Sequence, residues 1–307
     1  IFRVIDFHLI LVDRYFEIAY FSCNMAKYQK SSKKNVSMTS LERRRYLIWS
    51  IAIPFILILF IAVWKYQSSI KYYFHVLFDK EIKTPNSEKS KHDARNILLM
   101  KAHDDKSFGI DVSQYQGNIE WDSVSLINTE FPIDFVFVRA TMGEKGKDTK
   151  FQKNWEGVKS INKLRGAYHY FRPNENSVKQ AKNFIKTVKL SPGDLPPVLD
   201  IEERPRTQSM DSLRVGLKRW LDLVESHYKV RPIVYSGDSY FTDFLETEFK
   251  DYKLWIANYN FWIESPKDHW DIWQFSEKGS VKGIKGFVDL NMYRADIEKL
   301  ENLTLPY

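Results

Sequence analysis

Two acidic residues stand at alternate positions where a short apolar run ends. The run from Pro197 to Glu202 reads PVLDIE, and its acids are Asp200 and Glu202. In an extended strand such residues leave the same face, roughly 6.5–7 Å apart at about 3.3 Å per residue. Neighbouring carboxylates push each other's pKa values apart, leaving one to donate a proton and one to stabilise positive charge. Glycosidic hydrolysis uses such a pair, although acids that only cap the next loop are the commoner cause of this spacing.

The framework for these acids follows Ser107, where eight short apolar or aromatic runs occur, and eight strands close a barrel. Helices are predicted between runs at Phe151–Lys163, Ser177–Val188 and Asp211–Tyr228, with shorter ones at Trp121–Asn128 and Tyr240–Glu248. The last two stretches between consecutive runs are too short for a helix. We therefore expect an α/β fold, an irregular TIM-like (β/α)5(β)3 barrel. The runs are Phe108–Val112, Phe135–Ala140, Gly166–Phe171, Pro197–Ile201, Pro232–Tyr235, Leu254–Ala257, Trp270–Phe275 and Phe287–Asn291.

Four acids are predicted at one rim of this barrel, because each falls at the C-terminal end of a run. They are Asp111 in GIDVSQYQG, Asp200 and Glu202 in VLDIE, and Asp289 in FVDLN. Catalytic groups of such barrels lie at the C-terminal ends of strands. Unpaired acids brought together cost stability, so four at one rim indicate a functional site rather than four caps.

Aromatic residues cluster at the same strand ends, and most of them are expected in the core. Tyr168, Tyr170, Tyr235 and Trp273 are the candidates for stacking on, or hydrogen bonding to, a sugar. His169 faces away from its tyrosine neighbours and is expected in the core. The sequence has no metal-ligand spacing, P-loop, G-x-G-x-x-G or G-x-S-x-G motif, so no metal, cofactor or acyl-transfer chemistry is predicted.

The positive charge of the chain, +7 in total, lies ahead of the barrel. Residues 1–106 contain 18 Lys/Arg and 10 Asp/Glu, whereas residues 107–307 contain 28 and 29. A nearly neutral domain lacks the basic surface that nucleic acids select, so a nucleic-acid partner is not expected. The single cysteine, Cys23, excludes an intramolecular disulfide.

Residues 47–64 read LIWSIAIPFILILFIAVW, without a charge, and predict a transmembrane helix in contact with the lipid bilayer. A buried core helix or a signal peptide would be the alternatives. Seven Lys/Arg residues precede it between Lys27 and Arg45 and four follow it between Lys65 and Lys83, which favours a cytoplasmic N-terminus. We expect a single-pass membrane protein whose barrel lies outside the cytoplasm.

The predicted organisation has four parts. Residues 1–46 form a basic cytoplasmic tail, 47–64 the transmembrane helix, 65–106 a polar tether and 107–307 the barrel. Residues 1–24 precede Met25, and either Met25 or Met38 would begin a conventional short tail. On that interpretation the first two dozen residues lie outside the mature protein.

The motifs resemble those of glycoside hydrolase family 25, the N,O-diacetylmuramidase type of lysozyme, over about Phe108 to Arg294. FGIDVSQYQG resembles the opening strand of the family, RGAYHYF its third strand and PPVLDIE its D-x-E motif. LWIANY and IWQFSEKGSVKGIKGFVDLNMY resemble the sixth strand and the closing block. Five motifs in the family order make the resemblance specific, and it covers the whole predicted barrel.

The resemblance implies that Glu202 is the catalytic acid/base, Asp200 the carboxylate beside it, and Asp111 and Asp289 the acids that complete the pocket. It implies cleavage of the β-1,4 bond after N-acetylmuramic acid in peptidoglycan, with retention of configuration. The strand spacing is looser than the roughly 5–5.5 Å of a direct nucleophile pair, which favours attack by the 2-acetamido group of the sugar, but both routes stay open. A non-catalytic peptidoglycan-binding module is the alternative function.

One motif departs from the family. Where many members have K-A-T-E-G after the second strand, this chain has RATMGEKG, with Arg139 for the lysine and Met142 for the glutamate. Either Glu144 takes over the local role of that glutamate, or the subsite there prefers a different glycan or peptide stem.

Overall fold

The computed structural model describes residues 40–65 and 87–306, and the chain divides into two units at Lys65. In the first unit, helix α2 (Ser40–Lys65) contains the apolar window Leu47–Trp64, whose mean hydropathy is 2.6 and which has no buried residue. Its length and composition suit a membrane span. The predicted tail, apart from its last residues, and Cys23 lie outside the described residues.

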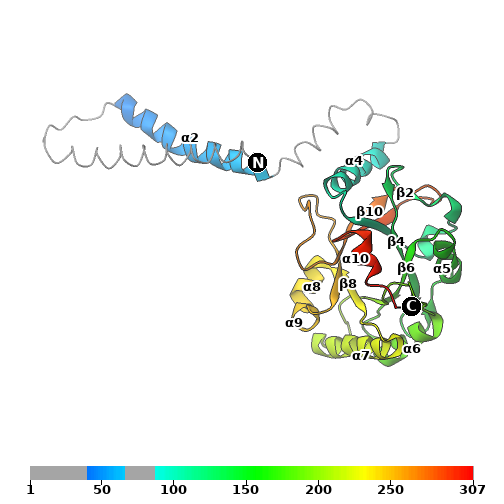
Figure 1. Ribbon diagram of the computed structural model, residues 1–307. Helices are drawn as coiled ribbons and strands as arrows, with labels where there is room; N and C mark the ends of the chain where they lie inside the picture. The colour runs from blue at the N-terminus through cyan, green and yellow to red at the C-terminus, as the bar shows by residue number, and fades with distance from the viewer. Residues whose placement is uncertain (1–39, 66–86, 307) are drawn as a thin grey trace. The chain divides into compact units, whose positions relative to one another are not determined.

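The second unit contains a closed ring of eight strands, and each of the eight predicted runs overlaps one of them (Figure 1). Neighbouring strands are parallel except at β11, which runs antiparallel to both β10 and β1. Pairing of β1 with β4 closes the ring. The strands are β1 (Ser107–Val112), β4 (Phe135–Met142), β6 (Leu164–Tyr170), β7 (Val198–Asp200), β8 (Ile233–Gly237), β9 (Lys253–Ala257), β10 (Ile272–Gly279) and β11 (Val288–Tyr293).

Helices follow the first five ring strands, as predicted for a (β/α)5(β)3 barrel. The helix after β1 is only a 3-10 turn at Trp121–Ser123, where a longer helix was expected. The others are α5 (Phe151–Ser160), α6 (Ser177–Thr187), α7 (Met210–Tyr228) and the pair α8 (Asp238–Phe244) and α9 (Glu246–Phe249). Small additions are the 3-10 turn Gln114–Gln116, strands β2 (Leu126–Ile127), β3 (Phe131–Pro132) and β5 (Gly146–Lys147), and helix α10 (Ile297–Glu301).

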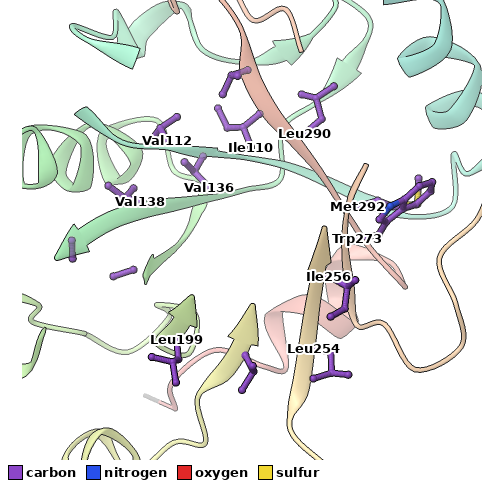
Figure 2. Packing of buried hydrophobic residues seen from close by; sticks show 14 of the residues in the cluster. Ile110, Val112, Val136, Val138, Leu199, Leu254, Ile256, Trp273, Leu290 and Met292 are labelled. Carbon is purple, nitrogen blue, oxygen red and sulfur yellow. The ribbon is translucent and has the colours of Figure 1, made fainter. Parts of the chain in front are cut away.

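The core has two layers because successive side chains of a strand point to opposite faces. Phe135, Phe137 and Trp255 fill the inside of the ring, where Phe137 stacks on Trp255 with ring centroids 4.6 Å apart. The outward-facing residues form the second layer, between the strands and the surrounding elements (Figure 2). Gly109 is required in the inner layer, since a Cβ there would lie 2.4 Å from the Phe135 ring.

The predicted tether over 65–106 is wrong in its second half. Residues Ser87–Ala102 form helix α4, which packs against β10 and buries Leu99 and Met100. Its apolar residues gather in the last turns instead of recurring at the 3.6-residue period, so the pattern did not predict a helix. Residues 66–86 of the tether lie outside the described residues.

Candidate active site

A cavity of about 320 Å³ opens at the rim where the parallel strands end. All four predicted acids line it: Asp111, Asp200, Glu202 and Asp289. The other lining residues include Tyr115, Arg139, Tyr168, Tyr170, Tyr235, Trp255, Tyr259, Gln274 and Glu277. The ring therefore places four carboxyls in one concave, aromatic-walled site, which is the typical form of a small-molecule or glycan pocket.

Strand register brings the acids together. Asp111 on β1 lies directly opposite Asp289 on β11, and Asp200 on β7 lies between Tyr170 and Tyr235 of the neighbouring strands. The sequence predicted Asp289 at the C-terminal end of its strand, but it is the second residue of β11. Because β11 is antiparallel, its beginning lies at the same rim as the ends of the other strands.

Asp111 is fixed by a network of amides and aromatic residues. Its Oδ2 accepts hydrogen bonds from Gln274 Nε2 (2.7 Å) and Asn291 Nδ2 (2.8 Å). Gln274 Oε1 in turn accepts from the hydroxyls of Tyr235 (2.8 Å) and Tyr259 (2.5 Å). Each amide has both ends engaged, since Asn291 Oδ1 also accepts from an indole N–H of the inner layer. This arrangement holds Asp111 in one orientation.

The cavity raises the pKa of each of the four carboxyls. Burial raises the pKa of Asp111 to about 6, against the opposing effect of its two amide donors. Burial, followed by the charges of Asp111 and Glu277, raises the pKa of Asp289 to about 9. The pair of Asp111 and Asp289 therefore retains a proton at neutral pH, and Asp289 has the higher pKa of the two.

Asp200 and Glu202 form the second pair. Burial raises the pKa of Asp200 well above its ordinary value, with the Glu202 charge as the next cause and Arg139 acting in the opposite direction. Asp200 Oδ1 is buried without a hydrogen-bond partner among the residues that the structure describes. The site therefore contains a desolvated carboxyl with one oxygen that can accept a hydrogen bond from a ligand.

Glu202 lies two residues beyond β7, at the mouth of the cavity. The residue as a whole is exposed, yet loss of water around its carboxyl raises its pKa. The next residue, Glu203, fixes this segment, because its carboxylate accepts from the Tyr170 hydroxyl (2.7 Å) and its carbonyl from the Tyr240 hydroxyl (2.8 Å). Glu202 can thus exchange protons with solvent while its backbone is held.

Three of the four predicted sugar-binding aromatic residues, Tyr168, Tyr170 and Tyr235, line the cavity. Trp273 does not. Its side chain is fully buried in the outer layer, beside Met292 (Figure 2), and its indole N–H donates to the Asn258 carbonyl (2.9 Å). Strand alternation is the reason: Gln274 faces inward, so its neighbour Trp273 faces outward.

Sequence reasoning missed the residues that support the acids. Gln274 and Asn291 oppose each other in the β10–β11 ladder, and both reach Asp111. Asn291 is two positions from Asp289, so strand alternation could have placed it on the inward face. No acid on the same face of its strand marks Gln274 in this way. Tyr115 is 76% exposed at the cavity and presents an open aromatic ring to a ligand.

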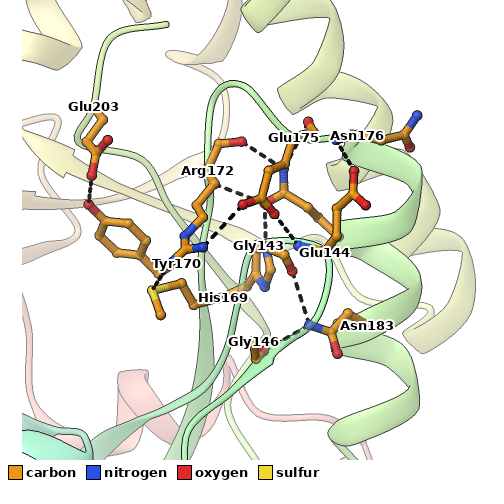
Figure 3. Close-up of polar contacts among 12 residues, drawn as sticks. Gly143, Glu144, Gly146, His169, Tyr170, Arg172, Glu175, Asn176, Asn183 and Glu203 are labelled. Atoms are coloured by element: carbon orange, nitrogen blue, oxygen red, sulfur yellow. Dashed lines mark hydrogen bonds and ion pairs between the residues drawn. The ribbon is translucent and has the colours of Figure 1, made fainter. Parts of the chain in front are cut away.

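The structure places Arg139 and Glu144 of the divergent RATMGEKG motif. Arg139 lines the cavity, donates from Nε to Asp148 Oδ2 (3.0 Å) and lies 4.6 Å from the centroid of the Tyr115 ring. Glu144 does not take over a role in the cavity. Its carboxylate accepts from the Asn176 backbone N–H (2.8 Å) at the start of α6 (Figure 3). It also pairs with Lys179 (3.3 Å).

Over residues 40–65 and 87–306, no group of three or more His, Cys, Asp or Glu side chains is arranged to hold a metal ion. The functional groups that line the cavity include carboxyls, tyrosine hydroxyls, amides and one guanidinium.

A sequence profile of glycosyl hydrolases family 25 matches residues 110–284, which contain three of the four acids and most of the ring. The chain belongs to glycosyl hydrolase family 25. The uncharacterized protein YegX of Escherichia coli (strain K12) is 39% identical over 197 residues, covering 63% of this chain and 71% of that protein. Lysozyme M1 of Streptomyces globisporus is 30% identical over 207 residues, covering 62% and 69%.

Solved structures agree with this family assignment. A family 25 glycosyl hydrolase from Bacillus anthracis superposes with a TM-score of 0.59 at 25% identity, covering 66% of this chain and 95% of that one. A bacterial lysozyme from Streptomyces coelicolor superposes with a TM-score of 0.58 at 27% identity, covering 64% of this chain and 96% of that one. As a member of family 25, the chain is a glycoside hydrolase of the lysozyme type.

Proposed function

We propose that this family 25 enzyme is a membrane-anchored muramidase. It hydrolyses the β-1,4 bond between N-acetylmuramic acid and N-acetylglucosamine in peptidoglycan, with retention of configuration. The observation that carries the proposal is the meeting of four carboxyls with raised pKa values in one aromatic-walled cavity. The similarity to Lysozyme M1 of Streptomyces globisporus supports the same substrate class.

The two members of the Asp200 and Glu202 pair take different roles. Glu202, at the solvent-accessible mouth, protonates the leaving glycosidic oxygen and later removes a proton from the attacking water. Asp200, deeper in the cavity, stabilises the positive charge that develops on the sugar. That charge lowers the pKa of Asp200 during the reaction, in the same direction as nearby Arg139.

The 2-acetamido group of the substrate is the proposed nucleophile. Asp200 Oδ1 is buried without a partner in the described part of the chain, so it is available to accept the acetamido N–H and orient the carbonyl oxygen toward the anomeric carbon. Muropeptides whose muramic acid lacks the acetyl group should then be cleaved at least about 100-fold more slowly. Equal cleavage of both substrates would favour direct attack by Asp200.

Hydrolysis is tested with the full chain in detergent on insoluble peptidoglycan, following reducing-end release and product mass. The parent should release muropeptides that end in reducing N-acetylmuramic acid, and Glu202→Gln should release none. Glu144→Gln is the matched control, because Glu144 accepts from the backbone N–H of Asn176, the N-cap of α6, and lies outside the cavity. If the parent releases nothing but pulls down cell walls as well as Glu202→Gln does, the chain is a non-catalytic binding module.

Membrane attachment through residues 47–64 is proposed from the exposed apolar surface of α2 and the excess of basic residues before it. Cysteine labelling gives a direct topology test. In intact cells, an impermeant maleimide should not label Ser40→Cys, which follows both candidate start methionines, in a Cys23→Ser background if the N-terminus is cytoplasmic. It should label Lys153→Cys, an exposed position of the barrel, in a Cys23→Ser background. The reverse pattern, or release of the barrel without α2, would contradict the proposal.

A further inference from the structure

Strand β10 is irregular where it passes the cavity. Gln274 pairs with Asn291 and Ser276 pairs with Leu290, so Phe275 is an extra residue that forms a β-bulge. In a regular strand, residues three positions apart face opposite sides. Here Gln274 and Glu277 both line the cavity. The bulge therefore allows one strand to supply both side chains to the site.

Helix α4 provides hydrogen-bond donors to the irregular part of this strand. The pairing of β10 with β9 ends at Gln274, and Arg95 Nη1 donates to the next carbonyl, that of Phe275 (2.9 Å). Asn96 Nδ2 donates to the carbonyl of Lys278 (3.2 Å), within a second register shift of β10. Two consecutive residues of α4 thus satisfy backbone carbonyls at both irregularities.

Arg95 also holds the segment between β9 and β10. Its Nη2 donates to the carbonyls of Asn260 (3.2 Å) and Ile263 (3.5 Å). This segment begins just after β9 and carries Tyr259, whose hydroxyl donates to Gln274 Oε1. The Arg95 guanidinium therefore joins the two backbone segments that carry Gln274 and its tyrosine partner.

We propose that Arg95 is a positioning residue of the active site, acting through the Phe275 bulge and the segment after β9 to hold Gln274 and Tyr259 around Asp111. It lies outside residues 110–284, the region matched by the family profile. Arginine suits the role because its planar fork serves several acceptors at once, which a lysine ammonium on a flexible stem does less well. The proposal rests on the muramidase activity proposed above. It implies that α4 contributes to the positioning of active-site residues.

The test compares Arg95→Ala, Arg95→Lys and the control Lys101→Ala in the full chain in detergent, well below the unfolding temperature of each. Lys101 lies on the same helix, but its ion pair with Glu130 is about half exposed. We expect Arg95→Ala to lower kcat by about 10- to 100-fold, with KM changed less than about threefold. The acid limb of its pH profile should move to higher pH, because Asp111 loses a well-placed donor. Arg95→Lys should be intermediate and Lys101→Ala unchanged.

Hydrogen exchange gives a readout that does not depend on activity. Amides of residues 258–265 and 275–279 should exchange faster in Arg95→Ala than in the parent, and at parental rates in Lys101→Ala. The proposal is overturned if Arg95→Ala only lowers stability while kcat and the pH profile match the control. A parent that does not hydrolyse peptidoglycan would refute the proposed function instead. In that case, unchanged hydrogen exchange in Arg95→Ala would refute the positioning role of Arg95.

Discussion

The carboxyl of Asp289 should cost the enzyme stability at neutral pH, and Asp289→Asn should recover it. In the folded protein the pKa of Asp289 is raised from 3.8 to about 9, mainly by burial and by Asp111. A raised folded-state pKa means that stability is present at acid pH and is lost as pH rises from about 4 to 9, because only the unfolded chain releases the proton. At pH 7 the stability lost in this way, relative to acid pH, amounts to at most about 4 kcal/mol.

Asparagine resembles the protonated acid but has no charge to release. We expect Asp289→Asn to raise the free energy of unfolding by about 1–3 kcal/mol at pH 7, since neighbouring acids share the penalty, and by less than about 0.5 kcal/mol at pH 4. A gain near 2 kcal/mol corresponds to about 4–8 °C in Tm for a domain of this size. The same variant should lose hydrolysis, as is common when a strained active site is relieved.

The assay is thermal and denaturant unfolding of the parent and Asp289→Asn at several pH values from 4 to 8. Asp251→Asn, at an exposed position away from the cavity, is the control and should show no pH-dependent gain. A stabilisation of equal size at pH 4 and pH 7 would refute the argument, because it would not arise from proton release. Destabilisation at pH 7 alone would show that Asp289 is ionised in the folded protein.

Three further substitutions test the site and the two core layers. Gln274→Met removes a charge-assisted hydrogen bond to Asp111, which raises the pKa of that carboxyl, so the acid limb of the kcat/KM profile should move to higher pH by about 1 unit. Trp273→Ala should lower the free energy of unfolding by about 3–5 kcal/mol in denaturant titrations, with KM unchanged, because the indole lies outside the cavity. Gly109→Ala should cost about 1–3 kcal/mol by the same measurement, because its Cβ would overlap the Phe135 ring.

Much of this site could be predicted from local sequence. Alternating apolar residues mark the strands, and acids at their ends mark the rim, since period and burial are local properties of a strand. Asp111, Asp200 and Glu202 were located in this way, and all three line the cavity together with Asp289. The order of the motifs was enough to indicate the family, which the profile match over residues 110–284 confirms.

Other features depended on register and packing between segments far apart in the chain. The antiparallel direction of β11 places Asp289 opposite Asp111, and the bulge at Phe275 sets which side chains of β10 enter the cavity. Neither can be read from one strand, because pairing partners define both. Trp273 was assigned to the wrong face because the sequence does not show which of two alternating neighbours, Trp273 or Gln274, faces the cavity. Helix α4 packs against β10, and each hydrogen bond of Arg95, to β10 or to the segment between β9 and β10, joins residues more than 160 positions apart. Only the tertiary structure reveals these contacts.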